Sequence, residues 1–449
     1  MKHPLRGFAA AVLLFASLPV LGKVSADEAA RLGKDLTPIG AEKAGNGAAI
    51  PAWTGGLPRQ GELSGAYPKN AKISADKPLF TITKDNLAQH ADKLTEGHKA
   101  LFSRYGDTYK MHVYPTHRPV AWPEEIYAST KANATTAVLE GTDDIRDANL
   151  GFPFPIPGTA AEVIWNHKVR WRGDAVTRYN NQAIVQADGG YQITKLTEWV
   201  KFKYGSIKQP TPLSQNMNLL YLSEVIAPPR LAGQLLLVHE TMNQVAGPRQ
   251  AWIYNPGLRR TRRAPNVAYD NPYEGTDGNQ FNDQVDMYNG AMDRYTWNLV
   301  GKKEMYIPYN SYKIASPDVS YEDIIEPRHI NQDLARYELH RVWVVDSQLR
   351  EGTNHTFGRR TFYVDEDSWT IAAIDCYDKR GQMYKVQEAH LVYAQSIQTV
   401  GGTPEIIYDL QSGRTFLTAL ANEDKPNDFS VDFDDRDFTS KTLAKKATR

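Results

Sequence analysis

Four consecutive extended segments in the last third of the chain constrain its fold more than any other feature. They cover residues 336–351, 355–369, 369–378 and 381–395 and are rich in Val, Tyr, Trp and Ile. Short polar stretches separate them, for example Asp-Lys-Arg-Gly at 378–381. Strands joined by such short turns pair with their neighbours in the chain, so we predict an antiparallel meander.

The middle of the chain adds strands and one clear helix. Residues 179–205 predict two strands around Gly189–Gly190, and Thr159 stands where it would cap a helix over 160–171. Strands and helices do not alternate, so the predicted class is α+β with a large curved antiparallel sheet. A helix lying in the concave face of such a sheet would cover a core or a cavity.

The N-terminus has the pattern of a secretory signal. Lys2 and Arg6 precede an apolar run at 8–21, and Val24 and Ala26 occupy the positions that a signal peptidase reads. We predict cleavage after Ala26 and export to the periplasm; a short membrane anchor is the alternative. Because no cysteine lies near the cleavage site, we do not expect a lipoprotein.

Proline and glycine content divides the rest of the chain. Residues 37–65 are rich in both and predict an irregular arm, and three prolines at 151–158 form a stiff connector. The predicted organisation is a signal peptide at 1–26, an arm and helical segment at 27–150, a β half-barrel at 151–400, and a C-terminal strand with a polar tail at 401–449.

Composition excludes several classes of protein. Lys plus Arg and Asp plus Glu both number 52, so the formal net charge is zero, which argues against a nucleic-acid binder. The single cysteine, Cys376, excludes an intrachain disulfide and reads as a small core residue.

No catalytic signature is present. The sequence lacks G-x-S-x-G, the phosphate-binding GxxxxGK[ST] loop and G-x-G-x-x-G, so we expect neither an enzyme nor a bound cofactor or metal. The acidic stretch at 270–286 offers oxygen ligands for calcium, but a solvated loop with Asx turns explains it better. His340, His355 and His390 lie on separate predicted strands, and the sequence leaves open whether they meet.

Two sets of charged residues remain as candidate functional sites, one acidic and one basic. An exported hydrolase would need paired carboxylates, but the acidic residues available stand mostly in predicted turns, where solvation is the default. These are Glu322, Asp323, Glu326, Asp365, Glu366 and Asp367. The densest basic cluster suits a lipid headgroup or an acidic partner, or else is a solvated face. It consists of Arg259, Arg260, Arg262 and Arg263.

Several longer stretches resemble one family. They are RLGKDLTPIGAEKAGN (31–46), IPAWTGGL (50–57), RRTRRAPNVAYDNP (259–272), YTWNLVGKKEMYIPYNSY (295–312), RYELHRVWVV (336–345), FYVDEDSW (362–369) and IDCYDKRGQMY (374–384). Together they resemble an uncharacterised family of exported Gram-negative proteins. The resemblance implies an unclosed half-barrel like that of the lipoprotein carriers LolA and LolB, and an association with RND-type exporters and outer-membrane partners. It carries over no catalytic residue, and this chain is about twice as long as those carriers.

The predicted function follows from the export signal, the antiparallel pattern and this resemblance. We expect a periplasmic carrier of lipid or another hydrophobic ligand, with an adaptor that docks an exporter as the alternative and a hydrolase as the second alternative. Apolar alternation along strands, with a helix as lid, gives the cavity candidates. They are Val163, Ile164, Val185, Ile193, Leu235, Leu237, Trp252, Tyr254, Trp343, Val345 and Ile371, with Ala373 beside them. Ordinary core packing of the same residues is the competing interpretation.

Overall fold

A computed structural model describes residues 23–63, 67–264, 270–273 and 275–446. The predicted signal peptide falls largely on residues 1–22, outside the described residues. Among the described helices, none is long and apolar enough to cross a membrane.

The helices are short and mostly precede the strands of the last third. The α-helices are α1 (Ala26–Ala29), α2 (Ala71–Ser74), α3 (Glu96–Tyr105), α4 (Glu124–Thr136), α5 (Ala160–Val169), α6 (Tyr321–Ile324) and α7 (Ser440–Lys446). The 3-10 helices are η1 (Leu87–Gln89), η2 (Ala91–Lys93), η3 (Leu213–Gln215), η4 (Asn282–Gln284) and η5 (Asp435–Asp437).

The strands supply most of the ordered structure. They are β1 (Phe80–Ile82), β2 (Met111–Val113), β3 (Val138–Glu140), β4 (Asp144–Arg146), β5 (Ala175–Tyr179), β6 (Asn181–Val185), β7 (Tyr191–Phe202), β8 (Leu219–Ala227), β9 (Leu235–Glu240), β10 (Gln250–Asn255), β11 (Arg260–Arg263), β12 (Tyr295–Pro308), β13 (Tyr337–Leu349), β14 (Arg359–Asp365), β15 (Ile371–Tyr377), β16 (Met383–Ala394), β17 (Thr399–Asp409) and β18 (Thr415–Leu420).

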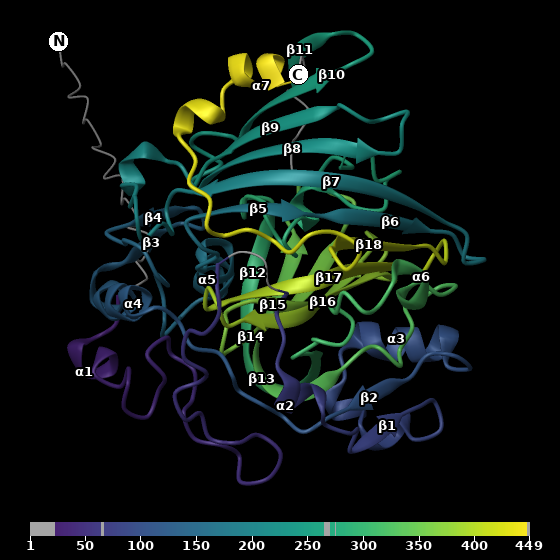
Figure 1. Ribbon diagram of the computed structural model, residues 1–449. Coiled ribbons are helices and arrows are strands. Elements are labelled where there is room, and N and C mark those ends of the chain that lie inside the picture. Colours follow the sequence, from purple (N-terminus) through teal and green to yellow (C-terminus); the bar gives the residue numbers. More distant parts are fainter. Residues whose placement is uncertain (1–22, 64–66, 265–269, 274, 447–449) are drawn as a thin grey trace, which may run out of the picture.

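Sixteen of these strands form one unclosed sheet. Its order is β1-β2-β13-β14-β15-β16-β17-β18-β6-β7-β8-β9-β10-β11, with β12 added beside β13 and β5 beside β7, and β3 and β4 form a separate hairpin. The described pairings are antiparallel except for one parallel contact between β2 and β13. The predicted α+β class and the unclosed antiparallel sheet are therefore confirmed. In Figure 1, β7–β10 run across the upper part of the view and β12–β14 run steeply through the part below them, which shows how strongly the sheet curves.

The predicted meander is the centre of this sheet, but the sheet extends beyond it. β13 to β16 pair in chain order, and β17 and β18 continue to β6, where Phe416 stands opposite Ile184. The boundary that we placed at 400 falls inside β17. Residues 401–420 therefore join the two halves of the sheet.

The two faces of the sheet carry different helices. Successive strand residues point to opposite faces, and on β16 the Gln387 amide donates to Met287 O at 3.2 Å, whereas Glu388 contacts His98 of α3 at 2.9 Å. We call the face of Gln387 the inner face and that of Glu388 the outer face. The segment around Met287 and α5 cover the inner face, because α5 His167 lies 2.8 Å from Asp286 O. Helix α3 therefore packs on the face of the sheet opposite to that of α5.

Helix α5 begins where the sequence predicts. The Thr159 hydroxyl accepts from Glu162 N, and the Glu162 carboxylate accepts from Thr159 N, which completes a capping box. The helix ends at Val169, two residues earlier than predicted, and Arg170 is already extended with ψ 154°. Every residue of α5 is buried, so this helix is part of the core.

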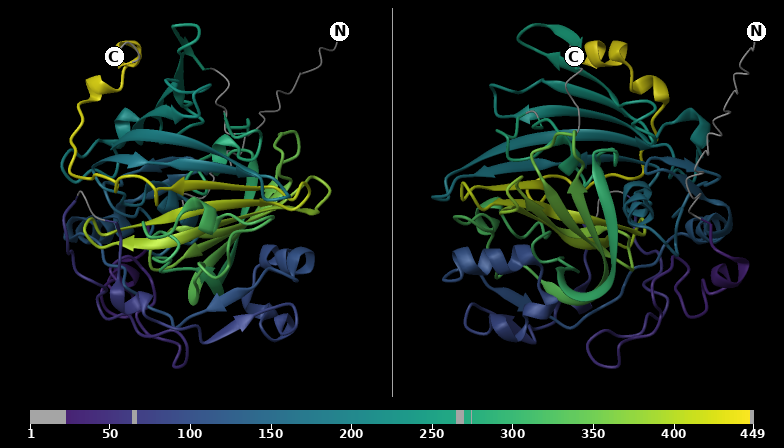
Figure 2. Two further views of the ribbon diagram at one scale, coloured as in Figure 1. Left: turned by 45° about the vertical axis from the view of Figure 1, so that its right-hand side comes forward. Right: turned by 180° about the vertical axis from the view of Figure 1, so that it is seen from behind.

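The terminal segments pack against the body. The irregular arm is held by Ile50, which is buried, and by the Trp53 indole, which donates to Val120 O at 3.0 Å. Helix α7 lies on the outer face of β9–β11, where Leu443 and Phe438 are buried. Figure 2 shows the arm and α7 at opposite ends of the molecule.

Candidate functional site

A cavity of about 240 Å³ opens on the inner face between β5, β7, β8, β9 and the segment 280–289. One wall is apolar and consists of side chains that alternate along four strands. They are Val176, Val200, Phe202, Leu219, Tyr221, Leu236 and Val238. The cavity therefore presents a continuous apolar wall formed by the sheet itself.

Other residues that line the cavity are charged. Arg170 and Arg172 both bind Asp286: Arg170 Nη1 lies 3.0 Å and Arg172 Nη1 2.6 Å from its Oδ2, and Arg170 Nη2 binds Oδ1. Glu405 of β17 accepts a hydrogen bond from Met287 N at 3.3 Å. We call Arg170, Arg172, Asp286 and Glu405 the polar floor.

The end of α5 explains how both arginines reach this floor. Because the chain becomes extended at Arg170, side chains alternate, and Trp171 points into the core while its neighbours on both sides point into the cavity. The Trp171 indole donates to Ile397 O at 3.0 Å, which fixes the alternation. Asp286 and Met287 have positive φ angles of 54° and 63°, so the carboxylate is presented from a strained turn.

The two carboxyl groups of the floor are shifted in opposite directions. The guanidinium groups of Arg170 and Arg172 outweigh burial and hold the pKa of Asp286 well below its usual range. Burial, with Asp286 nearby, raises the pKa of the Glu405 carboxyl to about 8. The arginines therefore favour the ionised form of Asp286, and burial favours the protonated form of Glu405.

The shift at Glu405 predicts a pH dependence of stability. A carboxyl whose pKa is raised on folding stabilises the protein below its unfolded pKa, about 4.3, and that contribution is lost as the pH rises through its folded value, about 8. Relative to Glu405→Gln, the wild type should lose free energy of unfolding between about pH 5 and pH 9, by roughly 1.4 kcal/mol per unit at most. Urea denaturation at several pH values measures this difference. A constant difference would contradict the prediction. Glu322→Gln is the control, because Glu322 is an exposed residue of α6.

The predicted cavity residues lie elsewhere. Six of them occupy the outer face: Val185, Ile193, Leu235, Leu237, Trp252 and Tyr254. The other five belong to or pack against the largest core cluster: Val163, Ile164, Trp343, Val345 and Ile371, as does Ala373. None of them is among the residues that line the cavity.

Along β9, the predicted cavity residues and the residues that line this cavity lie on opposite faces of the strand. Leu235 and Leu237 pack under α7, while Leu236 and Val238 between them line the cavity. The two pairs of residues are similarly hydrophobic, so hydrophobicity does not show which pair lines a cavity. Helix α7 belongs to a polar C-terminal tail, and the sequence of that tail did not indicate that it covers the sheet. The arginines of the polar floor were missed, although Arg-Trp-Arg directly after a capped helix is a pattern that could have indicated them.

Of the three histidines that the sequence left open, His340 and His355 have separate acidic partners, whereas the buried ring nitrogens of His390 have no hydrogen-bond partner among the described residues. His340 Nε2 lies 3.1 Å from Glu338, and His355 Nε2 lies 3.1 Å from Asp283. Burial lowers the pKa of His390 to about 4. Cys376 is buried, as predicted, and burial raises the pKa of its thiol to about 12.

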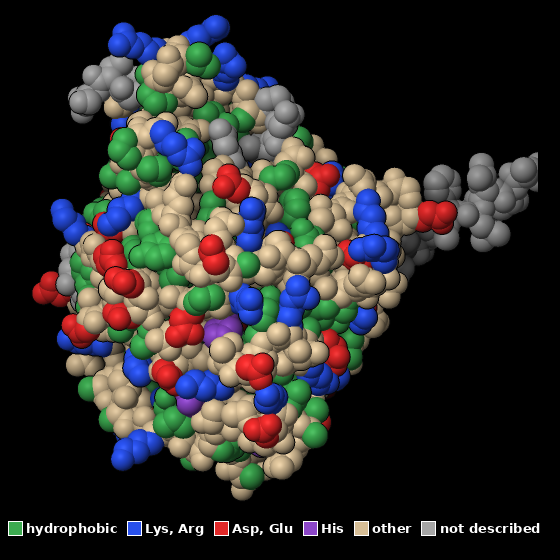
Figure 3. All heavy atoms as spheres, turned by 90° about the vertical axis from the view of Figure 1, so that its right-hand side faces the viewer, with side chains coloured by type: hydrophobic (Ala, Val, Ile, Leu, Met, Phe, Trp, Pro, Cys, Tyr) green, Lys and Arg blue, Asp and Glu red, His purple; other side chains and the backbone are tan. Residues whose placement is uncertain are grey.

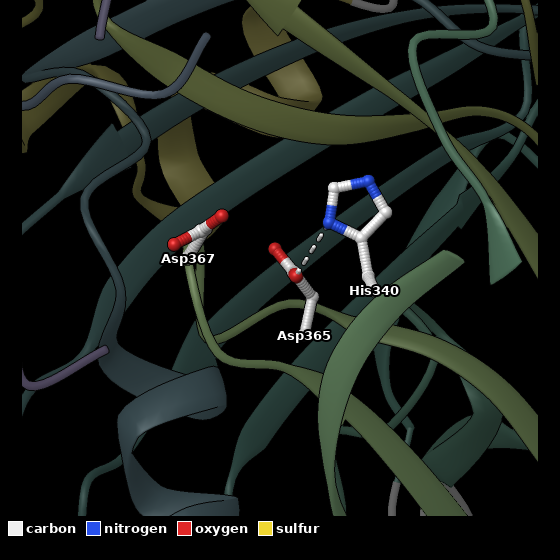
Figure 4. A group of neighbouring side chains, drawn as sticks. All are labelled: His340, Asp365 and Asp367. Carbon is white, nitrogen blue, oxygen red and sulfur yellow. Dashed lines mark ion pairs between the residues drawn. The ribbon is translucent and has the colours of Figure 1, made fainter. Parts of the chain in front are cut away.

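The turn at 365–368 is not a solvated turn as the sequence suggested, because its acidic residues are buried. Figure 4 shows Asp365, Asp367 and His340 pointing toward one another, and one ligand atom from each lies within 4.8 Å of the others. Arg118 donates to both Asp367 oxygens at 2.7 Å, so a cation would have to displace a guanidinium. Arg118 also donates to Glu42 O at 2.7 Å, so this cluster fastens the arm to the sheet.

The predicted basic cluster is exposed at the end of the sheet. Its four arginines stand on the β10–β11 hairpin, and β11 pairs with β10 alone. No ion pair between described residues includes any of them. Figure 3 shows Lys and Arg side chains gathered at the top end of the molecule, where this hairpin and α7 lie in Figure 1.

Comparisons with known proteins identify relatives of unknown activity. Residues 81–444 match the family model described as protein of unknown function (DUF1329). An uncharacterized protein of Pseudomonas aeruginosa is 47% identical over 441 residues, covering 96% of this chain and 95% of that protein.

Solved structures with a similar fold come from three other bacteria. A putative outer membrane lipoprotein-sorting protein domain from Vibrio parahaemolyticus is 12% identical, covers 63% of this chain and 97% of its own, and has a TM-score of 0.44. A DUF1329 family protein from Desulfovibrio piger is 13% identical, covers 60% of this chain and 92% of its own, and has a TM-score of 0.42. A LolA superfamily protein from Nitrosomonas europaea is 13% identical, covers 64% of this chain and 100% of its own, and has a TM-score of 0.39.

Proposed function

The chain belongs to the DUF1329 family of proteins of unknown function, and on that premise we propose that it is a carrier that binds a hydrophobic or amphiphilic molecule in the inner-face cavity. The observation that carries the proposal is the wall of seven apolar or aromatic side chains beside a buried polar floor. An apolar wall binds alkyl groups at ~0.8 kcal/mol per buried CH₂ without directional bonds, which suits a cargo that is later released.

The place of action in the proposal is the periplasm. The predicted signal peptide supports it, and envelope transport with an RND-type exporter or an outer-membrane partner is the context that the sequence resemblance implied. Titration with the neutral fluorophore N-phenyl-1-naphthylamine tests the proposal. We expect saturable binding of one probe per chain; fluorescence that rises without saturation would contradict it.

A hydrolase is the alternative that one observation favours. Asp286 and Glu405 are two carboxyl groups in one cavity whose pKa values are shifted apart, which is a pattern found in acid–base pairs. However, both oxygens of Asp286 accept hydrogen bonds from Arg170 and Arg172. A carboxylate held in this way is poorly placed to act as a nucleophile or base, and we therefore prefer binding.

The basic hairpin gives the carrier a route to a membrane. Leu258 at its tip is 52% exposed, beside Arg259 and Arg260. Each arginine near an anionic bilayer contributes about 1 kcal/mol of attraction. Replacing the four arginines of the cluster by glutamine should therefore weaken binding to phosphatidylglycerol-containing vesicles more than ten-fold, as measured by co-sedimentation.

A matched variant distinguishes the effect of the hairpin arginines from the effect of the protein's overall net charge. It replaces four exposed arginines elsewhere, namely Arg31, Arg104, Arg350 and Arg380, by glutamine. This variant should bind the same vesicles like the wild type. Equal losses in the two variants would show that overall charge, and not the hairpin, governs the interaction.

A further inference from the structure

The polar floor holds more positive than negative charge. Two guanidinium groups, those of Arg170 and Arg172, share the single carboxylate of Asp286. Arg170 is 3% exposed, so its charge is shielded from solvent. One positive charge at the floor is therefore left without a protein counter-charge whenever the neighbouring Glu405 is protonated.

The other charged groups facing the cavity do not supply the missing charge. Arg178 pairs with Glu198, and Arg249 pairs with Glu240 at 3.1 Å. The full set of charged lining residues is Arg170, Arg172, Arg178, Arg249, Glu198, Glu240, Asp286 and Glu405. Four arginines thus face four carboxyl groups, and burial favours the protonated form of one of these, Glu405.

The two arginines of the floor also have unused hydrogen-bond donors. The buried Nε–H groups of Arg170 and Arg172 have no partner among the described residues. Buried donors are normally satisfied, because an unmade bond to a charged group is costly. An acceptor with a negative charge would satisfy both the donors and the charge.

The position of Arg172 connects the floor to the apolar wall. Its guanidinium carbon lies 4.7 Å from the centre of the Phe202 ring, and Phe202 belongs to the wall. A ligand with its charged end at Arg172 would lay its remaining length along β7, β8 and β9. The geometry thus suits a molecule with a charged head and an apolar tail.

The cavity volume limits the size of that tail. Its volume of about 240 Å³ is below the usual range of drug-sized pockets, about 300–1,000 Å³. This size favours a ligand with one short alkyl chain over a larger one.

We propose that the cavity binds a single-chain amphiphile whose carboxylate head contacts Arg170 and Arg172 and whose alkyl tail lies on the wall of β7, β8 and β9. This inference rests on the proposed carrier function and names its ligand class. A carboxylate matches the single excess charge and accepts the paired donors of a guanidinium. The protonated Glu405 carboxyl group adds a further donor at the floor.

Calorimetric titration of the full chain with decanoate and with decanol, its uncharged counterpart, tests the inference at about pH 7. The wild type should bind decanoate at least ten-fold more tightly than decanol. Arg172→Gln should weaken decanoate binding about ten-fold or more, as expected for the loss of a charged hydrogen bond, and leave decanol binding within two-fold. Arg172→Lys, which keeps the charge, should retain part of the preference.

Arg359→Gln is the matched control, because Arg359 is half-exposed and pairs with Asp346 away from the cavity. It should leave both affinities unchanged. Equal affinities of the wild type for the two probes, or an equal loss of both in Arg172→Gln, would overturn the anionic head site while the apolar carrier stands. Failure of the wild type to bind either probe would overturn both.

Discussion

Replacing Arg118 by methionine is expected to lower the free energy of unfolding by about 3–5 kcal/mol, the usual cost of removing one partner from a buried ion pair. The Arg118 side chain is only 2% exposed, and it donates to both oxygens of Asp367 at 2.7 Å. Without it, Asp367 would remain buried beside Asp365 and Glu366 with less counter-charge. The carbonyl groups of the arm that accept from Arg118 would lose their donor as well.

Urea denaturation measures this loss of free energy of unfolding, and two further variants show whether it comes from the buried ion pair. Arg31→Met breaks the exposed Arg31–Asp35 pair and should have little effect on stability. Arg118→Met combined with Asp367→Asn should recover part of the loss, because the buried charge is removed together with its partner. An Arg118→Met variant as stable as Arg31→Met would show that the arm is not fastened through this cluster.

Replacing Leu236 by tryptophan is expected to weaken ligand binding more than ten-fold. Leu236 is half-buried and lines the cavity from β9, so a larger indole at this position occupies the space of the tail. Displacing only two methylene groups from the wall costs ~1.6 kcal/mol, which already exceeds a factor of ten in affinity. Fluorescence titration with N-phenyl-1-naphthylamine measures the loss.

Ile226→Trp is the matched control for this variant. Ile226 lies on the neighbouring strand β8, is 50% exposed and does not line the cavity. The same increase in side-chain size there should leave the affinity unchanged. If Leu236→Trp binds the probe as the wild type does, the ligand lies outside the inner-face cavity.

The sequence predicted the sheet well because local patterns determine it. Short polar turns between strands rich in Val, Tyr and Trp imply pairing of chain neighbours, and β13 to β16 follow that rule. The capping pair Thr159 and Glu162 likewise marked the start of α5. What the local pattern could not show is that β18 pairs with β6, some 230 residues earlier in the chain.

The candidate site was harder to predict because it depends on what covers each face. Leu235 and Leu236 are equally hydrophobic, and only the position of α7 decides which of them lines a cavity. Asp286 stood in a stretch that read as a solvated loop, yet two arginines from the end of α5 enclose it. Burial of polar residues by segments that are distant in the chain depends on the tertiary structure, and local sequence patterns do not indicate it.

Native mass spectrometry of the protein purified from its own cell envelope, with lipid extraction of the same sample, tests the carrier function most directly. We predict a bound single-chain amphiphile that is present in the wild type and in Ile226→Trp and absent from Leu236→Trp. A wild-type protein that stays without ligand, even after incubation with membranes, would contradict the account.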